Sequence, residues 1–270
     1  MARSPDAGTS SPVQRYLLDL ELLRWRAAGR RAVLWWRDDD ARTETPALRR
    51  LLDLAGRHST PFALAVIPDQ ELRTLAACLA VGVNACPVQH GVDHQNRREG
   101  AEAGEFPHHW LRLRVVTPMR QGWSRMQVLP DVLPLFVPPW NDIHPELPGA
   151  IADCGYVAWS AWSTLPEAAL ETPRAPPPRI DAHIDLLRWR GGARFRGASK
   201  IYIALREQLE TRRKAERWDA PIGLLTHHLD HDEAAWAFLE DLLAWTRTHP
   251  DIAWRGPREL VAPAPQAAAG

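Results

Sequence analysis

The sequence of 270 residues is poor in cysteine and has no excess of charge of either sign. Its three cysteines show no CxxC spacing, so the sequence favours neither a disulfide framework nor a zinc site built from thiolates. The 33 acidic residues balance the 33 basic residues. A chain with zero net charge has no long-range field that would hold nucleic acid or an anionic membrane surface. We therefore expect any partner to be recognised locally, in a pocket.

Long apolar runs are missing as well. No segment approaches the ~20 apolar residues that span a bilayer, and the opening segment MARSPDAGTSS lacks the apolar stretch of a secretory signal. We therefore predict a cytoplasmic protein with no membrane span, while the sequence gives no indication of the oligomeric state. The composition, with 45% hydrophobic and 24% charged residues, is that of a globular protein with a sizeable core.

Short apolar segments alternate with helical patterns along most of the chain. The apolar segments predict about eight strands, at residues 32–36, 62–67, 85–88, 135–137, 156–159, 180–184, 222–225 and 252–254. Apolar residues at helical spacing predict helices at residues 46–54, 72–79, 145–153, 199–213 and 232–248. This alternation favours a parallel sheet, and about eight strands favour a closed α/β barrel.

The chain shows no domain linker, so we predict a single barrel domain over residues 31–260. A helical extension over residues 1–30 precedes it, and a flexible tail over residues 261–270 follows it. The proline-rich residues 172–179 predict a stiff connection within the domain.

Polar side chains gather where the predicted strands end. They form three groups, which are Asp38–Asp40 after the first strand, His90 and His94 after the third, and His227 and His228 after the seventh. In parallel α/β folds the loops that follow the strands meet on one face. The sequence therefore predicts one site that unites the three groups, and their residue types permit a metal centre.

The run Asp38–Asp40 has two interpretations. A triple aspartate is commonly a solvated turn or a helix N-cap. Directly after a buried strand, it would instead place at least one carboxylate in the crevice, where metal ligation or general base catalysis would offset the repulsion between the acids. Arg37 could pair with one of the three aspartates.

His90 and His94 lie four residues apart, a separation that lets two imidazoles face one point if the segment turns helically. An exposed histidine pair is the alternative. Two imidazoles and one carboxylate make a three-ligand set that leaves positions open for water and substrate, and such a set suits Zn²⁺ or a similar divalent ion.

The segment THHLDHD after the seventh strand contains His227, His228 and His231. It could bind a metal itself, and His228 and His231 also suit exposed positions at the start of a helix. For His227 we favour general acid catalysis, because a histidine with an ordinary pKa of ~6.5 can donate a proton to a leaving amine near neutral pH.

Taken in order, five segments resemble the motifs of the polysaccharide deacetylase family, the family 4 carbohydrate esterases with a NodB homology domain. The Asp-Asp pair of the first motif is matched by Asp38 and Asp39, with Asp40 where the family has glycine, so the register stays open by one residue. The second motif, His-Ser/Thr-x-x-His, is matched by His90 and His94, with glycine in place of the hydroxyl residue. The resemblance implies that Asp38 is the general base and that Asp39, His90 and His94 bind the metal.

The third motif, Arg-x-Pro-Tyr/Phe-Gly, corresponds to VPPWN at residues 137–141 and lacks its arginine. In the family this arginine orients the base, so Arg37 could supply the charge instead. A backbone N–H near Pro139 and Trp140 would hold the oxyanion.

The last two motifs complete the site that the resemblance implies. Asp185 and Trp189 match the fourth motif, in which tryptophan forms a wall of the site, although Asp181 is a rival for the acid. The fifth motif, Leu-x-His, is matched at residues 225–227 and implies His227 as the general acid. Arg37, Asp40 and His228 would support these groups or line the site.

The resemblance implies a distorted NodB-type α/β barrel of seven or eight strands and a metal-dependent hydrolase that removes an N-acetyl or related acyl group from an amino sugar or saccharide. One divalent ion would be the cofactor, zinc before cobalt, nickel or manganese. The alternatives are an amide hydrolase for a small non-sugar substrate, a non-catalytic carbohydrate-binding protein with the same fold, and a phosphoesterase with two metals held by Asp38, Asp40 and the THHLDHD segment.

Overall fold

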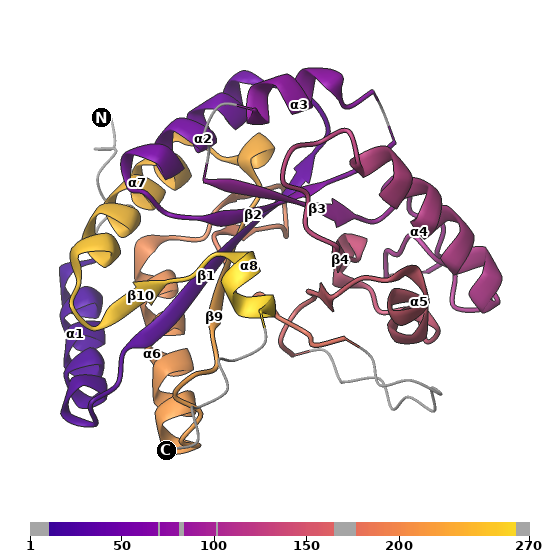
Figure 1. Ribbon diagram of the computed structural model, residues 1–270. Helices are drawn as coiled ribbons and strands as arrows, with labels where there is room; N and C mark the ends of the chain where they lie inside the picture. Colours follow the sequence, from indigo (N-terminus) through magenta and orange to yellow (C-terminus); the bar gives the residue numbers. More distant parts are fainter. Residues whose placement is uncertain (1–10, 70, 81–83, 101, 165–176, 263–270) are drawn as a thin grey trace, which may run out of the picture.

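The computed structural model describes residues 11–69, 71–80, 84–100, 102–164 and 177–262. Within them, eight strands form one parallel sheet that curls into an incomplete barrel with helices outside it (Figure 1). The strands are β1 (Ala32–Ala41), β2 (Phe62–Val66), β3 (Ala85–His90), β4 (Leu135–Val137), β5 (Ala158–Trp159), β6 (Ile184–Asp185), β9 (Ile222–Thr226) and β10 (Ile252–Trp254). A separate antiparallel pair consists of β7 (Leu187–Arg188) and β8 (Arg194–Phe195).

The sheet follows the order β5-β4-β3-β2-β1-β9-β6, and β10 pairs with the first residues of β1. Isolated parallel bridges, from Trp159 to Arg179 and from Trp162 to Ala182, join the β5 end to the segment that leads into β6. The predicted distorted α/β barrel is therefore confirmed, although the two ends of the sheet meet at isolated bridges and form no continuous ladder among the described residues.

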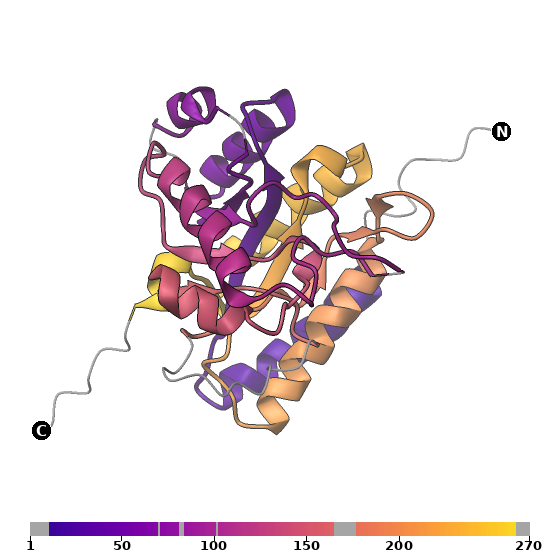
Figure 2. The ribbon, with the colours of Figure 1, turned by 90° about the vertical axis from the view of Figure 1, so that its right-hand side faces the viewer.

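Most of the helices cover the outer face of the sheet. Two of them begin at side-chain N-caps, because Thr45 accepts a hydrogen bond from the backbone N–H of Leu48 and Asp232 accepts one from Ala235. The helices are α1 (Pro12–Ala27), α2 (Pro46–Arg57), α3 (Arg73–Leu79), α4 (Arg112–Met126), α5 (Leu147–Cys154), α6 (Ala198–Lys214), α7 (Glu233–Thr248) and α8 (Pro257–Val261). The N-terminal helix α1 packs along α6, as both views show (Figures 1 and 2).

Successive residues of the long strand β1 face opposite sides of the sheet. Leu34 and Trp36 belong to the hydrophobic cluster between the sheet and the outer helices, whereas Trp35 belongs to the cluster inside the barrel. The same alternation directs Arg37 and Asp39 inward. The short helix α8 packs against the inner cluster as well, so apolar side chains fill the barrel beneath the site.

Most predicted elements are confirmed, with helix ends that shift by at most three residues. The prediction of a full strand over residues 180–184 is wrong in its extent. It bridges the β5 end at Ala182 and pairs with β9 only from Ile184, because the chain passes here from one sheet end to the other. The predicted proline-rich connection and the predicted tail lie largely outside the described residues, which omit 165–176 and 263–270. No helix in the described ranges is long and apolar enough to cross a membrane.

Candidate active site

A cleft of about 530 Å³ opens where the parallel strands end. Its walls come from the segments that follow β1, β3, β4, β5, β6 and β9, which are far apart in the sequence. The lining residues are Asp39, Asp40, His94, Trp140, Asn141, Trp162, Asp185, Leu187, Trp189, Arg196, Leu225 and His227. The three predicted groups of polar residues therefore each contribute to one site, as the parallel sheet requires.

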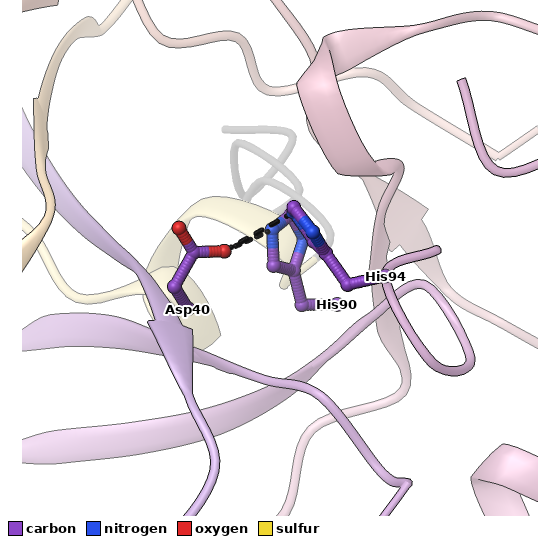
Figure 3. Close-up of side chains that lie close together, drawn as sticks. All are labelled: Asp40, His90 and His94. Carbon is purple, nitrogen blue, oxygen red and sulfur yellow. Dashed lines mark ion pairs between the residues drawn. The ribbon is translucent and has the colours of Figure 1, made fainter. Parts of the chain in front are cut away.

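Asp40 and His94, which line this cleft, come together with the buried His90 (Figure 3). The Oδ1 atom of Asp40 lies 3.2 Å from the Nε2 atom of His90 and 3.2 Å from the Nε2 atom of His94. Among the described residues, this is the one group of three whose ligand atoms all lie within 4.8 Å of one another. Its location at the ends of β1 and β3 makes it the candidate metal centre.

The donor set fits a divalent cation. The Nδ1 atom of His90 lies 3.0 Å from the carbonyl oxygen of Val137, which leaves Nε2 directed at Asp40 as the ligand atom. The buried Oδ1 atom of Asp40 has no hydrogen-bond partner in the described residues. One carboxylate and two imidazoles match the three-ligand sets that hold zinc and leave further positions open.

Electrostatics at this point favour a positive charge. Burial raises the pKa of Asp40, but the nearby imidazoles of His90, His94 and His227 outweigh it and lower this pKa well below its usual range. Burial lowers the pKa of His90, whereas Asp39 and Asp40 raise it above its ordinary value. Burial also lowers the pKa of His94, which favours the neutral imidazole that a metal requires.

The carboxylate that joins the two histidines is Asp40, one residue beyond the predicted Asp39. The register of β1 against β2 shifts between Asp38 and Ala41, and Asp40 has a left-handed φ of 74°. This irregularity interrupts the alternation of the strand, so the neighbouring carboxylates of Asp39 and Asp40 both reach the cleft. Asp39 lines the cleft but does not join the two histidines.

Asp39 is held by Arg37, which lies two residues earlier on the same inward face of β1. The Arg37 Nε atom lies 2.9 Å from Asp39 Oδ1, and its NH2 atom donates to Asp39 Oδ2 at 3.0 Å. Arg37 is 0% exposed and also donates to Ser160 Oγ and Asn141 Oδ1. Arg37 is thus a buried cation beside Asp39, and contacts to both oxygens fix the position of the carboxylate.

Asp38, predicted as the general base, lies outside the lining of the cleft. Its carboxylate is 0% exposed and accepts hydrogen bonds from Thr226 Oγ1 at 2.6 Å and from the backbone N–H of His228 at 3.1 Å. The Nδ1 atom of His228 lies 2.5 Å from Asp38 Oδ1. His228, predicted at the site wall, is thus buried with Asp38 away from the cleft. The physical reason is the strand alternation, which separates Asp38 from its neighbours.

The opposite side of the cleft contains Asp185, Trp189 and His227. Asp185 accepts hydrogen bonds from the backbone N–H of Leu187 at 2.8 Å and from Trp189 Nε1 at 2.7 Å. Trp189 contacts the ring of His227 edge to face, with centroids 4.6 Å apart. Burial raises the pKa of Asp185 although the charge of His227 lowers it. The rival Asp181 pairs with Arg179 instead and does not line the cleft.

Trp140 forms the rim of the cleft next to the candidate metal centre. It has a left-handed φ of 54° in a short turn after β4, and its ring packs against that of His94 at a tilt of 44°, with centroids 4.2 Å apart. Pro139 is buried and has no N–H, so the only backbone donor of this predicted pair is that of Trp140.

Sequence reasoning missed the buried residue Glu105. Its carboxylate accepts hydrogen bonds from the backbone N–H groups of Val92, Asp93 and His94, the segment that carries the second histidine. Glu105 lies in residues 91–134, where the apolar pattern is weak, so the sequence offers no signal that would link it to the histidine pair.

Comparison with solved structures identifies the fold. A candidate polysaccharide deacetylase from Mycobacterium smegmatis is similar to this chain with a TM-score of 0.58 and 15% sequence identity, over 96% of this chain and 91% of that one. A family 4 carbohydrate esterase (CE4) pseudoenzyme from Bacillus anthracis is similar with a TM-score of 0.50 and 12% identity, over 86% of this chain and 66% of that one. No protein-family model and no curated protein matches the sequence. The chain therefore has the NodB-type fold of the polysaccharide deacetylases and CE4 esterases.

Proposed function

We propose that this protein is a metal-dependent hydrolase that removes an N-acetyl or related acyl group from an amino sugar or saccharide. The observation that carries the proposal is the convergence of Asp40, His90 and His94 in a cleft that also contains Asp39 and His227. A carboxylate and an imidazole beside a three-ligand centre are the two proton-transfer groups that amide hydrolysis needs.

Asp39 is the proposed general base. The Arg37 guanidinium holds it by two contacts, so its carboxylate is fixed in the cleft, where it would accept a proton from water. A divalent ion at Asp40, His90 and His94 would polarise the scissile carbonyl and lower the pKa of water. Zinc suits this donor set best, and cobalt, nickel and manganese are alternatives.

His227 is the proposed general acid. Its ring contacts Trp189 in the cleft, and the buried Asp185 lies near enough to interact with it electrostatically. A protonated His227 would donate to the departing nitrogen. The backbone N–H of Trp140 would donate to the oxyanion that forms on the carbonyl, on the side of the candidate metal centre.

The cleft supports a substrate of saccharide size. A volume of about 530 Å³ is within the range of small-ligand pockets. Trp140 and Trp189 are 40% and 47% exposed, and Trp162 completes a lining in which indole faces could contact sugar rings. Trp159 is buried in the core and takes no part in this lining.

Two alternatives remain distinct from this proposal. A non-catalytic carbohydrate-binding protein is one, because the fold also occurs in a CE4 pseudoenzyme. The presence of the complete donor set together with a tethered carboxylate argues against it. The two-metal phosphoesterase is disfavoured, since the described residues around Asp38 and His228 form no second group with metal-ligand spacing.

The test is acetate release by protein reloaded with Zn²⁺ or Co²⁺, using N-acetylglucosamine, its short oligomers and an N-acetylated alkylamine as probes. We expect release from the saccharides and its loss in a His227→Gln variant that keeps its metal. Release from the alkylamine alone would favour the non-sugar amide hydrolase. Saccharide binding by calorimetry without any acetate release would favour the non-catalytic protein.

A further inference from the structure

The loop between His90 and His94 adopts a backbone that its own side chains do not explain. Gly91 and His94 have left-handed φ values of 57° and 56°. A non-glycine residue such as His94 adopts this conformation at a cost, so the surroundings must stabilise it. The loop carries one of the candidate metal ligands, and its conformation decides whether His94 reaches the other two.

The side chain of Glu105 accepts hydrogen bonds from three successive backbone N–H groups of this loop. Its Oε1 atom accepts hydrogen bonds from the N–H groups of Val92 at 2.9 Å, Asp93 at 2.8 Å and His94 at 2.7 Å, and Oε2 accepts a further one from Val92 at 3.0 Å. Glu105 is 1% exposed. Three successive N–H groups that converge on one carboxylate form an anion-binding nest, here filled from within the chain.

Gly91 is shaped to admit this carboxylate. A Cβ atom at position 91 would lie 2.4 Å from Pro139 Cγ and 2.6 Å from Glu105 Oε2, distances that real Cβ atoms do not reach. The serine or threonine of the resembling motif could not occupy this position without moving its neighbours. The space for that hydroxyl side chain is taken by Glu105 and Pro139.

We propose that Glu105 is a positioning residue that presets the His90–His94 loop and so fixes His94 for metal binding. This inference rests on the proposed metal centre. It goes further because it names the group that holds the loop. Position 91 has no side chain for this purpose, and Glu105 lies more than ten positions away in the sequence. A charge-assisted carboxylate anchor would hold the loop in its binding conformation before the metal arrives.

The test compares Zn²⁺ affinity in the wild type, Glu105→Gln and the matched control Glu102→Gln, by competition with a chromogenic chelator. Glu102 lies on the same segment, is largely exposed and pairs with Arg98. We expect Glu105→Gln to weaken binding by about 10- to 100-fold, the range for residues that orient metal ligands, because the amide removes the charge and turns its own N–H group toward the N–H of Val92 in place of Oε2. We expect Glu102→Gln to leave binding unchanged. The visible spectrum of the Co²⁺ form of Glu105→Gln should change as well, because His94 would no longer be fixed.

Equal affinity and equal Co²⁺ spectra in the wild type and Glu105→Gln would overturn the inference while leaving the metal centre intact. No metal binding by the wild type would instead overturn the proposed function on which it rests. A second measurement covers the case in which Glu105→Gln does not fold. In the metal-free wild type, the amides of Val92, Asp93 and His94 should be protected from hydrogen exchange, and rapid exchange at all three would contradict a preset loop.

Discussion

The run Asp38–Asp40 divides between two regions of the molecule. These regions differ in whether the aspartate oxygens have hydrogen-bond partners. Behind β1, Asp38 accepts hydrogen bonds from Thr226 and His228 and is fully buried. In the cleft, Asp40 directs an oxygen without a hydrogen-bond partner at two imidazole nitrogens.

The difference separates a structural cluster from a functional one. Buried carboxylates normally have all their partners, and the proposed metal would supply the partner that the Asp40 oxygen lacks. Three adjacent and chemically identical residues thus take different proposed roles, because the pleat of the strand and one left-handed residue direct them to different surroundings.

The largest effect should come from the base in the cleft. Replacing Asp39 with Asn removes the proton acceptor but keeps the shape of the side chain. We expect kcat for acyl release to fall by about 10²- to 10⁴-fold, the usual contribution of a general base, with metal content unchanged. Steady-state kinetics measure this, and Asp39→Asn with wild-type kcat would return the role of base to Asp38.

The cluster behind the strand should respond in stability and only weakly in chemistry. Asp38→Ala leaves His228 and the Thr226 hydroxyl without their buried acceptor, so we expect the free energy of unfolding to fall by about 3 kcal/mol. Urea unfolding measures the loss, and Asp38→Asn should lose less because it keeps an acceptor oxygen. A folded Asp38→Asn variant with no turnover at all would contradict the division between the two regions.

Arg37 lies on β1 and contacts Asp39 in the cleft. We expect the geometry of its guanidinium group, and not only its charge, to affect catalysis. Lysine at this position keeps a positive charge but cannot make the two contacts to Asp39. We expect Arg37→Lys to reduce kcat by about 10- to 100-fold while Zn²⁺ affinity changes little. A loss of metal binding larger than the loss in kcat would show that Arg37 supports the metal ligands and not the base.

At neutral pH the smallest effect is that of His231, which packs against Trp236 outside the lining of the cleft. Burial lowers its pKa to about 4 from the ordinary 6.5. The unfolded chain therefore binds a proton first as the pH falls. The contribution of this residue to stability is complete above pH 6.5 and is lost as the pH falls toward 4, by at most about 1.4 kcal/mol per pH unit. The unfolding free energy of His231→Phe should decline less steeply over this range, and an unchanged slope would refute the assignment.

Much of the fold could be predicted from short patterns in the sequence. The buried strands around Trp35, Ala63 and Val88 have the apolar runs of a parallel sheet, and the principle that such strands end on one face predicted where the polar groups would gather.

The detailed arrangement of the site depends on backbone angles and contacts that no short stretch of sequence predicts. The left-handed φ of Asp40 and the shift of register beside it determine which aspartate joins the histidines, and no residue type there requires them. The partners of Asp38 and the hydrogen bonds of Glu105 are contacts made after the chain has folded, so spacing alone could not reveal them.

The most direct test of the account is the Zn²⁺ affinity and metal content of three proteins: the wild type, Asp40→Asn and Asp39→Asn, measured by mass spectrometry of metals after dialysis and by chelator competition. We predict about one equivalent in the wild type and in Asp39→Asn, and an affinity reduced by more than about 100-fold in Asp40→Asn. Metal retained by Asp40→Asn and lost by Asp39→Asn would contradict the assignment of Asp40 as the ligand and Asp39 as the base.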